Sequence, residues 1–202
     1  MNLRDEQLEL LAEWINIGMG QASAILHDML QSPIQLRVPQ VAVATPGEAI
    51  AHLAGLDADE LSAVCMQFSG SHQGTVALVF PLSSTAGLLS LLCEDSIPSS
   101  EMDAMKSAAL TEIGNIILNS VLGGIVSLME THVDFQVPFY AEDRPEHIMR
   151  AMTEAGGESH VIVAKTNFSV QRNAVEGCII ALFEISFLSK LGEALERYLK
   201  SV

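Results

Sequence analysis

A polar pattern that occurs twice constrains this chain more than any other feature of its sequence. A Glu, an Asn and a Pro recur at a constant offset of 99 residues. The earlier set is called the first copy and the later set the second copy: Glu13, Asn16, Pro39 and Glu112, Asn115, Pro138. In each copy the Glu and the Asn are three residues apart within an apolar-periodic segment, so on a helix they share one face.

The order of predicted elements repeats as well. Hydrophobic periodicity and turn residues predict, in the first half, helix 4–30, strand 34–44, short helix 48–54, strands 63–69 and 75–81, and helix 83–93. The second half predicts helix 101–130, strand 133–140, helix 145–155, strands 161–170 and 175–184, and helix 187–199. A unit this long is no solenoid repeat, so we expect a single duplicated domain.

The expected fold class is α/β (α+β). One domain, residues 1–202, would consist of two pseudo-repeats, about 4–97 and 99–202, related by pseudo-two-fold symmetry. Its two long motif helices would pack with a largely antiparallel sheet. Pro39 predicts an edge position or a bulge for its strand.

The first long helix is expected to bury one face and to expose the opposite one. The residues predicted to face the core are Leu8, Leu11, Ile15, Ala22, Ile25 and Met29. Glu13 and Asn16 lie on the opposite face. The duplicated pattern therefore predicts two similar surface sites, not one enclosed pocket.

Charge and composition narrow the classes of function. A net charge of -15 argues against nucleic acid or an anionic membrane as partner, because both require a basic surface. The three cysteines, Cys65, Cys93 and Cys178, have no metal-ligand spacing and read as core hydrophobes in a reducing compartment. The apolar stretches 61–93 and 113–129 are interrupted by polar residues and glycines, so we expect no membrane insertion and a cytoplasmic location.

The duplicated Glu and Asn are better explained by function than by folding. A single such pair on a solvated helix face is common, but Asn is a poor helix former and here it recurs, with Asn119 added on the same face. The six histidines show no ligand spacing, and no glycine-rich phosphate loop is present. We therefore expect neither a metal nor a cofactor bound by this chain.

Both motif segments, EWINIGMGQASAIL and EIGNIILNSVLGGI, resemble the CheC/CheX/FliY family of chemotaxis phosphatases. The family motif is Asp or Ser, three residues, Glu, two residues, Asn, and Pro after about 22 more, and both copies here have its Glu, Asn and Pro at this spacing. Two copies favour a CheC-like member. Glu9 and Ala108 occupy the usual Asp/Ser position, and Trp14-Ile15 stands where Ile-Gly is usual.

The resemblance implies a substrate, the aspartyl phosphate of a phosphorylated CheY-like response regulator that carries its own Mg²⁺. Phosphoryl transfer depends mainly on positioning and charge stabilisation, and a carboxamide can align water without titrating. We therefore assign Asn16 and Asn115 to water alignment, and Glu13 and Glu112 to docking against a regulator lysine. Pro39 and Pro138 would shape the neighbouring strands. The receptor deamidase CheD is a further partner that the resemblance implies.

A non-catalytic reading stays open beside this one. The two polar faces would then bind a response regulator, as an adaptor module of the chemotaxis or flagellar apparatus. Phosphate release from phosphorylated regulators distinguishes the two, because a pure binder leaves the intrinsic decay rate unchanged.

Overall fold

The computed structural model describes residues 3–56, 59–85, 99–153, 159–170 and 173–201. Its first half contains α1 (Asp5–Leu30), β1 (Ile34–Ala44), α2 (Pro46–Ala54), β2 (Leu61–Gly70), β3 (Gly74–Pro81) and the 3-10 turn η1 (Leu82–Ser84). Its second half contains α4 (Ser99–Leu128), β4 (Val133–Phe135), β5 (Phe139–Asp143), α5 (Pro145–Thr153), β6 (Ser159–Val170), β7 (Asn173–Glu184) and α6 (Ile185–Ser201). The predicted order is confirmed, except that helix 83–93 falls mostly outside the described residues.

The strands form one antiparallel sheet. Its order is symmetric when β1, β2 and β3 of the first half are matched with β4–β5, β6 and β7 of the second half. The order is β1-β6-β7-β3-β2-β4, and β5 also pairs with β2. The first strand of each half therefore pairs with a strand of the other half, which is the arrangement expected of two halves that share one core. β1 and the β4–β5 segment form the two edges.

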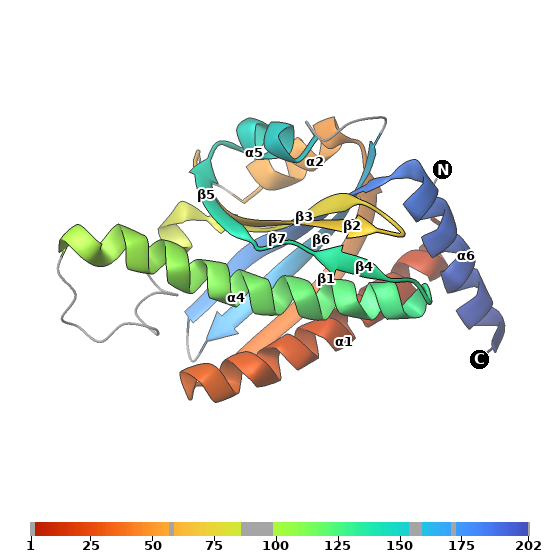
Figure 1. Cartoon of the computed structure of the whole chain (residues 1–202), viewed down its shortest axis with the longest axis horizontal. Coiled ribbons are helices and arrows are strands. Elements are labelled where there is room, and N and C mark those ends of the chain that lie inside the picture. Colours follow the sequence, from red (N-terminus) through yellow and green to blue (C-terminus); the bar gives the residue numbers. More distant parts are fainter. Residues whose placement is uncertain (1–2, 57–58, 86–98, 154–158, 171–172, 202) are drawn as a thin grey trace.

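Helices cover both faces of this sheet (Figure 1). α1, α4 and α6 pack on one face over the larger core, and α2 and α5 pack on the other over a smaller core. Strand residues alternate between the two cores, as the pleat requires: Val64 and Met66 of β2 face the larger core, and Ala63 and Cys65 the smaller. Cys65 is 4% exposed, which confirms it as a core residue, and this burial raises the pKa of its thiol to about 12.

The local signals at the helix ends are duplicated too. α1 and α4 are each followed by a residue with positive φ, Gln31 at 50° and Glu130 at 52°, the left-handed conformation that often ends helices. α2 and α5 begin on Pro46 and Pro145, where a proline costs no helical hydrogen bond. These equivalent positions are 99 residues apart, like the two copies.

The predicted buried face of α1 is correct only near the middle of the helix. Leu11, Ile15 and Ala22 are buried, whereas Ile25 and Met29 are 49% and 43% exposed. Leu26 is buried in their place. The buried stripe advances by four residues from Ala22 to Leu26, where the prediction advanced by three to Ile25, and both steps are compatible with helical periodicity.

Both edge strands contain an extra residue beside the motif proline. In β1, Arg37 pairs with Asn167 and Gln40 with Lys165, so three steps on β1 match two on β6. This bulge at Val38–Pro39 confirms the edge and bulge predicted from Pro39. At the other edge, Phe135 and Phe139 pair with Phe68 and Cys65, so four steps match three on β2. The predicted strand 133–140 is therefore split into β4 and β5 around Pro138.

Candidate functional site

The two Glu/Asn pairs lie on neighbouring helices. Glu13 and Asn16 belong to α1, and Glu112 and Asn115 belong to α4, which lies beside α1 on the same face of the sheet (Figure 1). The helices approach closely at Gly18, where an added Cβ would lie 2.7 Å from the carbonyl oxygen of Ser120. Gly18 therefore permits the close packing of α1 against α4. Gly20 and Gly123 have no such role, because nothing lies within 4 Å of a Cβ added at either.

Gly114 sets the height of the second copy above the sheet. A Cβ at Gly114 would lie 2.5 Å from Cγ1 of Val64 in β2, so α4 sits directly on the strand at the residue before Asn115. The first copy has Ile15 at the equivalent position, and its side chain is buried to 2% exposure. α1 must stand farther from the sheet there, because it accommodates a whole isoleucine. The two copies are therefore not geometrically equivalent.

In the first copy, the carboxamide of Asn16 is bound to the bulge of β1. Its Nδ2 donates to the carbonyl oxygens of Val38 and Ala12, each at 2.9 Å. The backbone N–H of Val38 donates to its Oδ1 at 2.8 Å. Asn16 thereby uses both of its N–H groups and one acceptor lone pair within the chain. It satisfies the two backbone groups of an edge-strand residue, a structural duty that sequence reasoning did not identify.

In the second copy, the carboxamide of Asn115 has a different partner. Its Oδ1 accepts a hydrogen bond of 2.6 Å from Nδ2 of Asn119, one turn further along α4. Across the described residues, no hydrogen bond links Asn115 to the backbone of Val137, the counterpart of Val38. The Val137 residue is 88% exposed, whereas Val38 is 3% exposed. The same motif has thus produced a closed first copy and an open second copy.

The motif glutamates are exposed in both copies. Neither Glu13 nor Glu112 forms an ion pair with another described residue. Glu9 and Ala108, at the position where the family motif has Asp or Ser, are exposed as well. An unpaired surface carboxylate has its full charge available for a cationic partner, which agrees with the docking role expected for Glu112.

Exposed apolar side chains lie along the edge strand that holds the second copy's proline. Phe135, Val137 and Phe139 are 37%, 88% and 50% exposed. The first-copy edge has no counterpart, because Leu36 and Val38 are buried. Sequence patterns did not predict this apolar rim, because alternation along strand 133–140 places Phe135, Val137 and Phe139 on one face and does not say whether that face is covered.

A polar cluster anchors this rim to α4. The Lys106 ammonium is ion-paired with Glu142 of β5, and the Tyr140 hydroxyl donates to the same carboxylate. Tyr140 also forms a 3.0 Å hydrogen bond with Ser62 of β2, and burial raises its pKa. Burial acts to raise the pKa of Glu142, but the hydrogen bonds from Lys106 and Tyr140 outweigh it and hold that pKa below its usual value.

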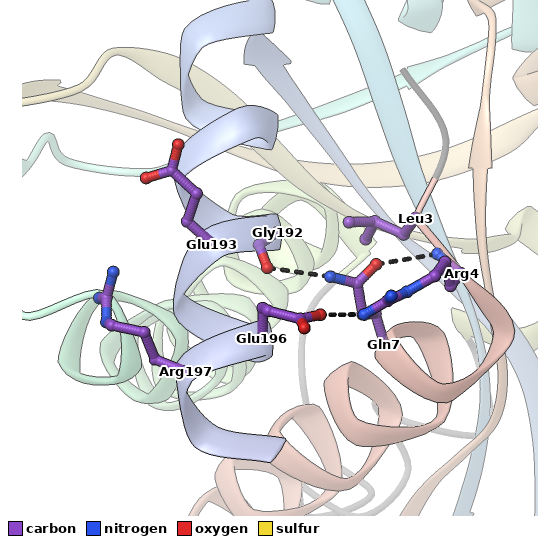
Figure 2. Close-up of a pocket in the computed structure, with 7 residues that line it drawn as sticks. All are labelled: Leu3, Arg4, Gln7, Gly192, Glu193, Glu196 and Arg197. Atoms are coloured by element: carbon purple, nitrogen blue, oxygen red, sulfur yellow. Dashed lines mark hydrogen bonds and ion pairs between the residues drawn. The ribbon is translucent and has the colours of Figure 1, made fainter. Parts of the chain in front are cut away.

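A cavity of about 520 Å³ lies away from both copies, between the start of α1 and α6 (Figure 2). Gln7 spans it: its Oε1 accepts from the backbone N–H of Arg4 at 3.0 Å, and its Nε2 donates to the carbonyl of Gly192 at 2.9 Å. Arg4 is ion-paired with Glu196. These contacts join α6 to α1, so the cavity reads as a helix-packing groove.

The described residues also show how the chain stands with respect to metal binding and membrane insertion. No group of three or more His, Cys, Asp or Glu residues in the described ranges is placed to hold a metal ion. By length and composition, Asp103–Leu128 is apolar enough to cross a membrane, contrary to the expectation drawn from its asparagines. Half of its most apolar window is buried against the rest of the protein, and Ile113, Ile117 and Leu118 belong to the larger core. α4 is therefore a core helix of this fold.

Comparison with known proteins identifies the family. The family model described as chemotaxis phosphatase CheX matches residues 62–164. The "CheY-P phosphatase CheC" of Bacillus subtilis (strain 168) is 24% identical over 182 residues, which cover 86% of this chain and 85% of that protein.

Solved structures share the fold. Thermotoga maritima FliY superposes with a TM-score of 0.74 at 18% identity, covering 98% of this chain and 99% of that one. A complex of CheX with CheY, BeF3 and Mg²⁺ from Borrelia burgdorferi matches with a TM-score of 0.50 at 20% identity, covering 86% of this chain and 99% of that chain. The chain belongs to the CheC/CheX/FliY family of chemotaxis phosphatases.

Proposed function

We propose that this protein hydrolyses the aspartyl phosphate of a CheY-like response regulator, and that the second copy is its main catalytic site. The observation that carries the proposal is the difference between the two asparagines. Asn115 is half-exposed, and among the described residues its carboxamide is bound only by the side chain of Asn119 and the neighbouring Glu112 has no ion pair. The carboxamide of Asn16 is occupied by the backbone of β1.

For hydrolysis of the aspartyl phosphate, this chain mainly has to position the attacking water molecule. The oxygen of a water molecule forms a bond to phosphorus while the bond from phosphorus to the aspartyl oxygen breaks, which yields a free carboxylate and inorganic phosphate. Asn115 would hold that water in line through one hydrogen bond donated and one accepted. Mg²⁺ belongs to the regulator in this scheme and supplies charge stabilisation there.

Glu112 and the apolar rim would recognise the partner. Glu112 offers a carboxylate to a lysine of the regulator, and Phe135, Val137 and Phe139 offer an adjoining apolar surface. A net charge of -15 favours a basic patch on the partner and speeds encounter with it. A CheD-like deamidase as a second partner stays a prediction.

A phosphatase assay tests the proposal. A CheY-like regulator from the same genome is phosphorylated with a small-molecule phosphodonor, and release of inorganic phosphate is followed with and without the protein. The proposal requires release faster than the regulator's own decay, and Asn115→Ala should lower the catalysed rate on the order of 10²-fold. An unchanged decay rate with the wild-type protein would refute catalysis.

The competing candidate is a module that binds the regulator without hydrolysing its phosphate. It is favoured by the occupied carboxamide of Asn16 and by Ala108, which brings no polar group to the family's Asp/Ser position. Affinity for the regulator, measured with and without beryllofluoride, distinguishes the candidates when read beside the phosphatase assay. Tight binding with unaltered decay would support the binding module.

A further inference from the structure

Asn119 is the one side chain that holds the Asn115 carboxamide in the described structure, and it lies outside the Glu/Asn/Pro pattern. It is half-buried on α4, and its Nδ2 lies 2.6 Å from Oδ1 of Asn115. Residues four apart face each other on a helix, so the contact needs no change in the backbone. This pairing occupies one lone pair of Oδ1 and leaves the Nδ2 of Asn115 for another partner.

The first copy has no asparagine at the position equivalent to Asn119, so it shows how the motif asparagine is bound without such a neighbour. Its equivalent of Asn119 is Gly20, which has no side chain and open space where a Cβ would be. There the carboxamide of Asn16 pairs with the backbone of Val38 and closes the bulge. In the second copy, where Asn119 occupies Oδ1, Val137 is exposed and the carboxamide is not bound to the strand.

Orientation matters for a group that must align water. The terminal torsion of an asparagine is broad and close to two-fold, so an unheld carboxamide samples both placements of its oxygen and nitrogen. Alignment of water requires one of these two placements. If the carboxamide must adopt that placement only in the transition state, the lost freedom lowers the rate. A donor fixed on the same helix removes that freedom before the substrate arrives.

We propose that Asn119 is a positioning residue, which fixes the Asn115 carboxamide for catalysis and keeps it off the β4–β5 backbone. This inference rests on the proposed phosphatase function of the second copy. Asn119 acts through Asn115 and does not itself touch the phosphoryl group.

A double-mutant cycle with phosphorylated regulator tests this. Asn119→Ala should lower kcat about 10-fold or more with KM and Tm unchanged. It should add nothing in the Asn115→Ala background, because its effect passes through Asn115. Ser127→Ala, an exposed position further along α4, is the control that should match the wild type. A wild-type kcat in Asn119→Ala, or an equal loss in both backgrounds, would overturn the inference.

A second readout separates this inference from the proposed function. The side-chain amide resonances of Asn115, assigned from their loss in Asn115→Ala, should shift in Asn119→Ala and stay in place in Ser127→Ala. This needs no catalysis. If the wild type fails to speed dephosphorylation, the proposed function fails while the resonances still report on the contact. If the resonances do not move, the inference about Asn119 is wrong even in an active phosphatase.

Discussion

The carboxamide of Asn16 and the backbone of Val38 exchange two hydrogen bonds, of 2.8 and 2.9 Å, across the bulge of an edge strand. Val38 is the residue before Pro39, so this contact gives the Asn-to-Pro spacing of the motif a structural meaning in the first copy. The second copy has the same spacing, yet Asn115 pairs with Asn119 and Val137 is exposed. One motif therefore supports two states, one closed on its strand and one open.

Removing the Asn16 side chain should lower stability. Asn16→Ala leaves the N–H and the carbonyl of Val38 without their partner in a part-buried site, at a cost of about 1–3 kcal/mol in the free energy of unfolding. Asn115→Ala is the matched control, since it breaks only a contact between two half-buried side chains. Urea denaturation measures both. Equal stabilities of the two variants would contradict the structural role of Asn16.

Two glycines of α4 should respond to alanine in opposite directions. Gly114→Ala would place a Cβ 2.5 Å from Val64, and this overpacking should cost about 1–3 kcal/mol. Gly123→Ala meets open space and should stabilise the helix by up to about 1 kcal/mol through its higher propensity. Thermal unfolding of the two variants measures the difference. A stable Gly114→Ala variant would mean that α4 does not rest on β2 there.

Acid should weaken the anchor of the edge strand. The pKa of Glu142 is below its ordinary value of 4.5 in the folded chain, so its contribution is complete above pH 4.5 and is lost as the pH falls through the folded pKa. Glu142→Gln should show a shallower loss of stability in this range, and Tyr140→Phe an intermediate one. Denaturation at a series of pH values measures the slopes. A Glu142→Gln slope equal to that of the wild type would count against the anchor.

The apolar rim should contribute to partner affinity and not to chemistry. Val137→Ser removes the most exposed apolar side chain of the rim and should weaken regulator binding roughly 10-fold, the effect of one interface contact of about 1.4 kcal/mol, while kcat is kept. Ile25→Ser, at a 49% exposed position on α1, is the control. Titration calorimetry with the beryllofluoride-bound regulator measures both. A loss of affinity limited to Ile25→Ser would place the partner elsewhere.

The sequence predicts the elements of this fold well and the state of its two sites poorly. Helix 4–30 is observed as Asp5–Leu30, and the bulge beside Pro39 follows from a proline that cannot donate to a ladder. Periodicity did not reveal that Leu26, and not Ile25, faces the core or that strand 133–140 is split, because both depend on contacts distant in sequence.

The hydrogen-bond partners of Asn16 and Asn115 could not be predicted from the motif spacing either. Asn16 and Asn115 have the same spacing to Glu and Pro, and only the structure separates them. A sequence signal nevertheless exists at the position four residues later, where Asn119 is opposed to Gly20. Our proposal for Asn119 attributes the difference in partner to the presence of a side-chain donor at that position in the second copy and its absence in the first.

Whether the second copy is the main catalytic site is decided by comparing Asn16→Ala with Asn115→Ala in a dephosphorylation assay. Each variant is measured against the phosphorylated regulator below its unfolding temperature, with rates expressed per folded protein by circular dichroism. We expect Asn115→Ala to lose on the order of 10²-fold in catalysed rate, while Asn16→Ala keeps most of the wild-type rate. A wild-type rate in Asn115→Ala, or an equal loss in Asn16→Ala, would contradict this expectation.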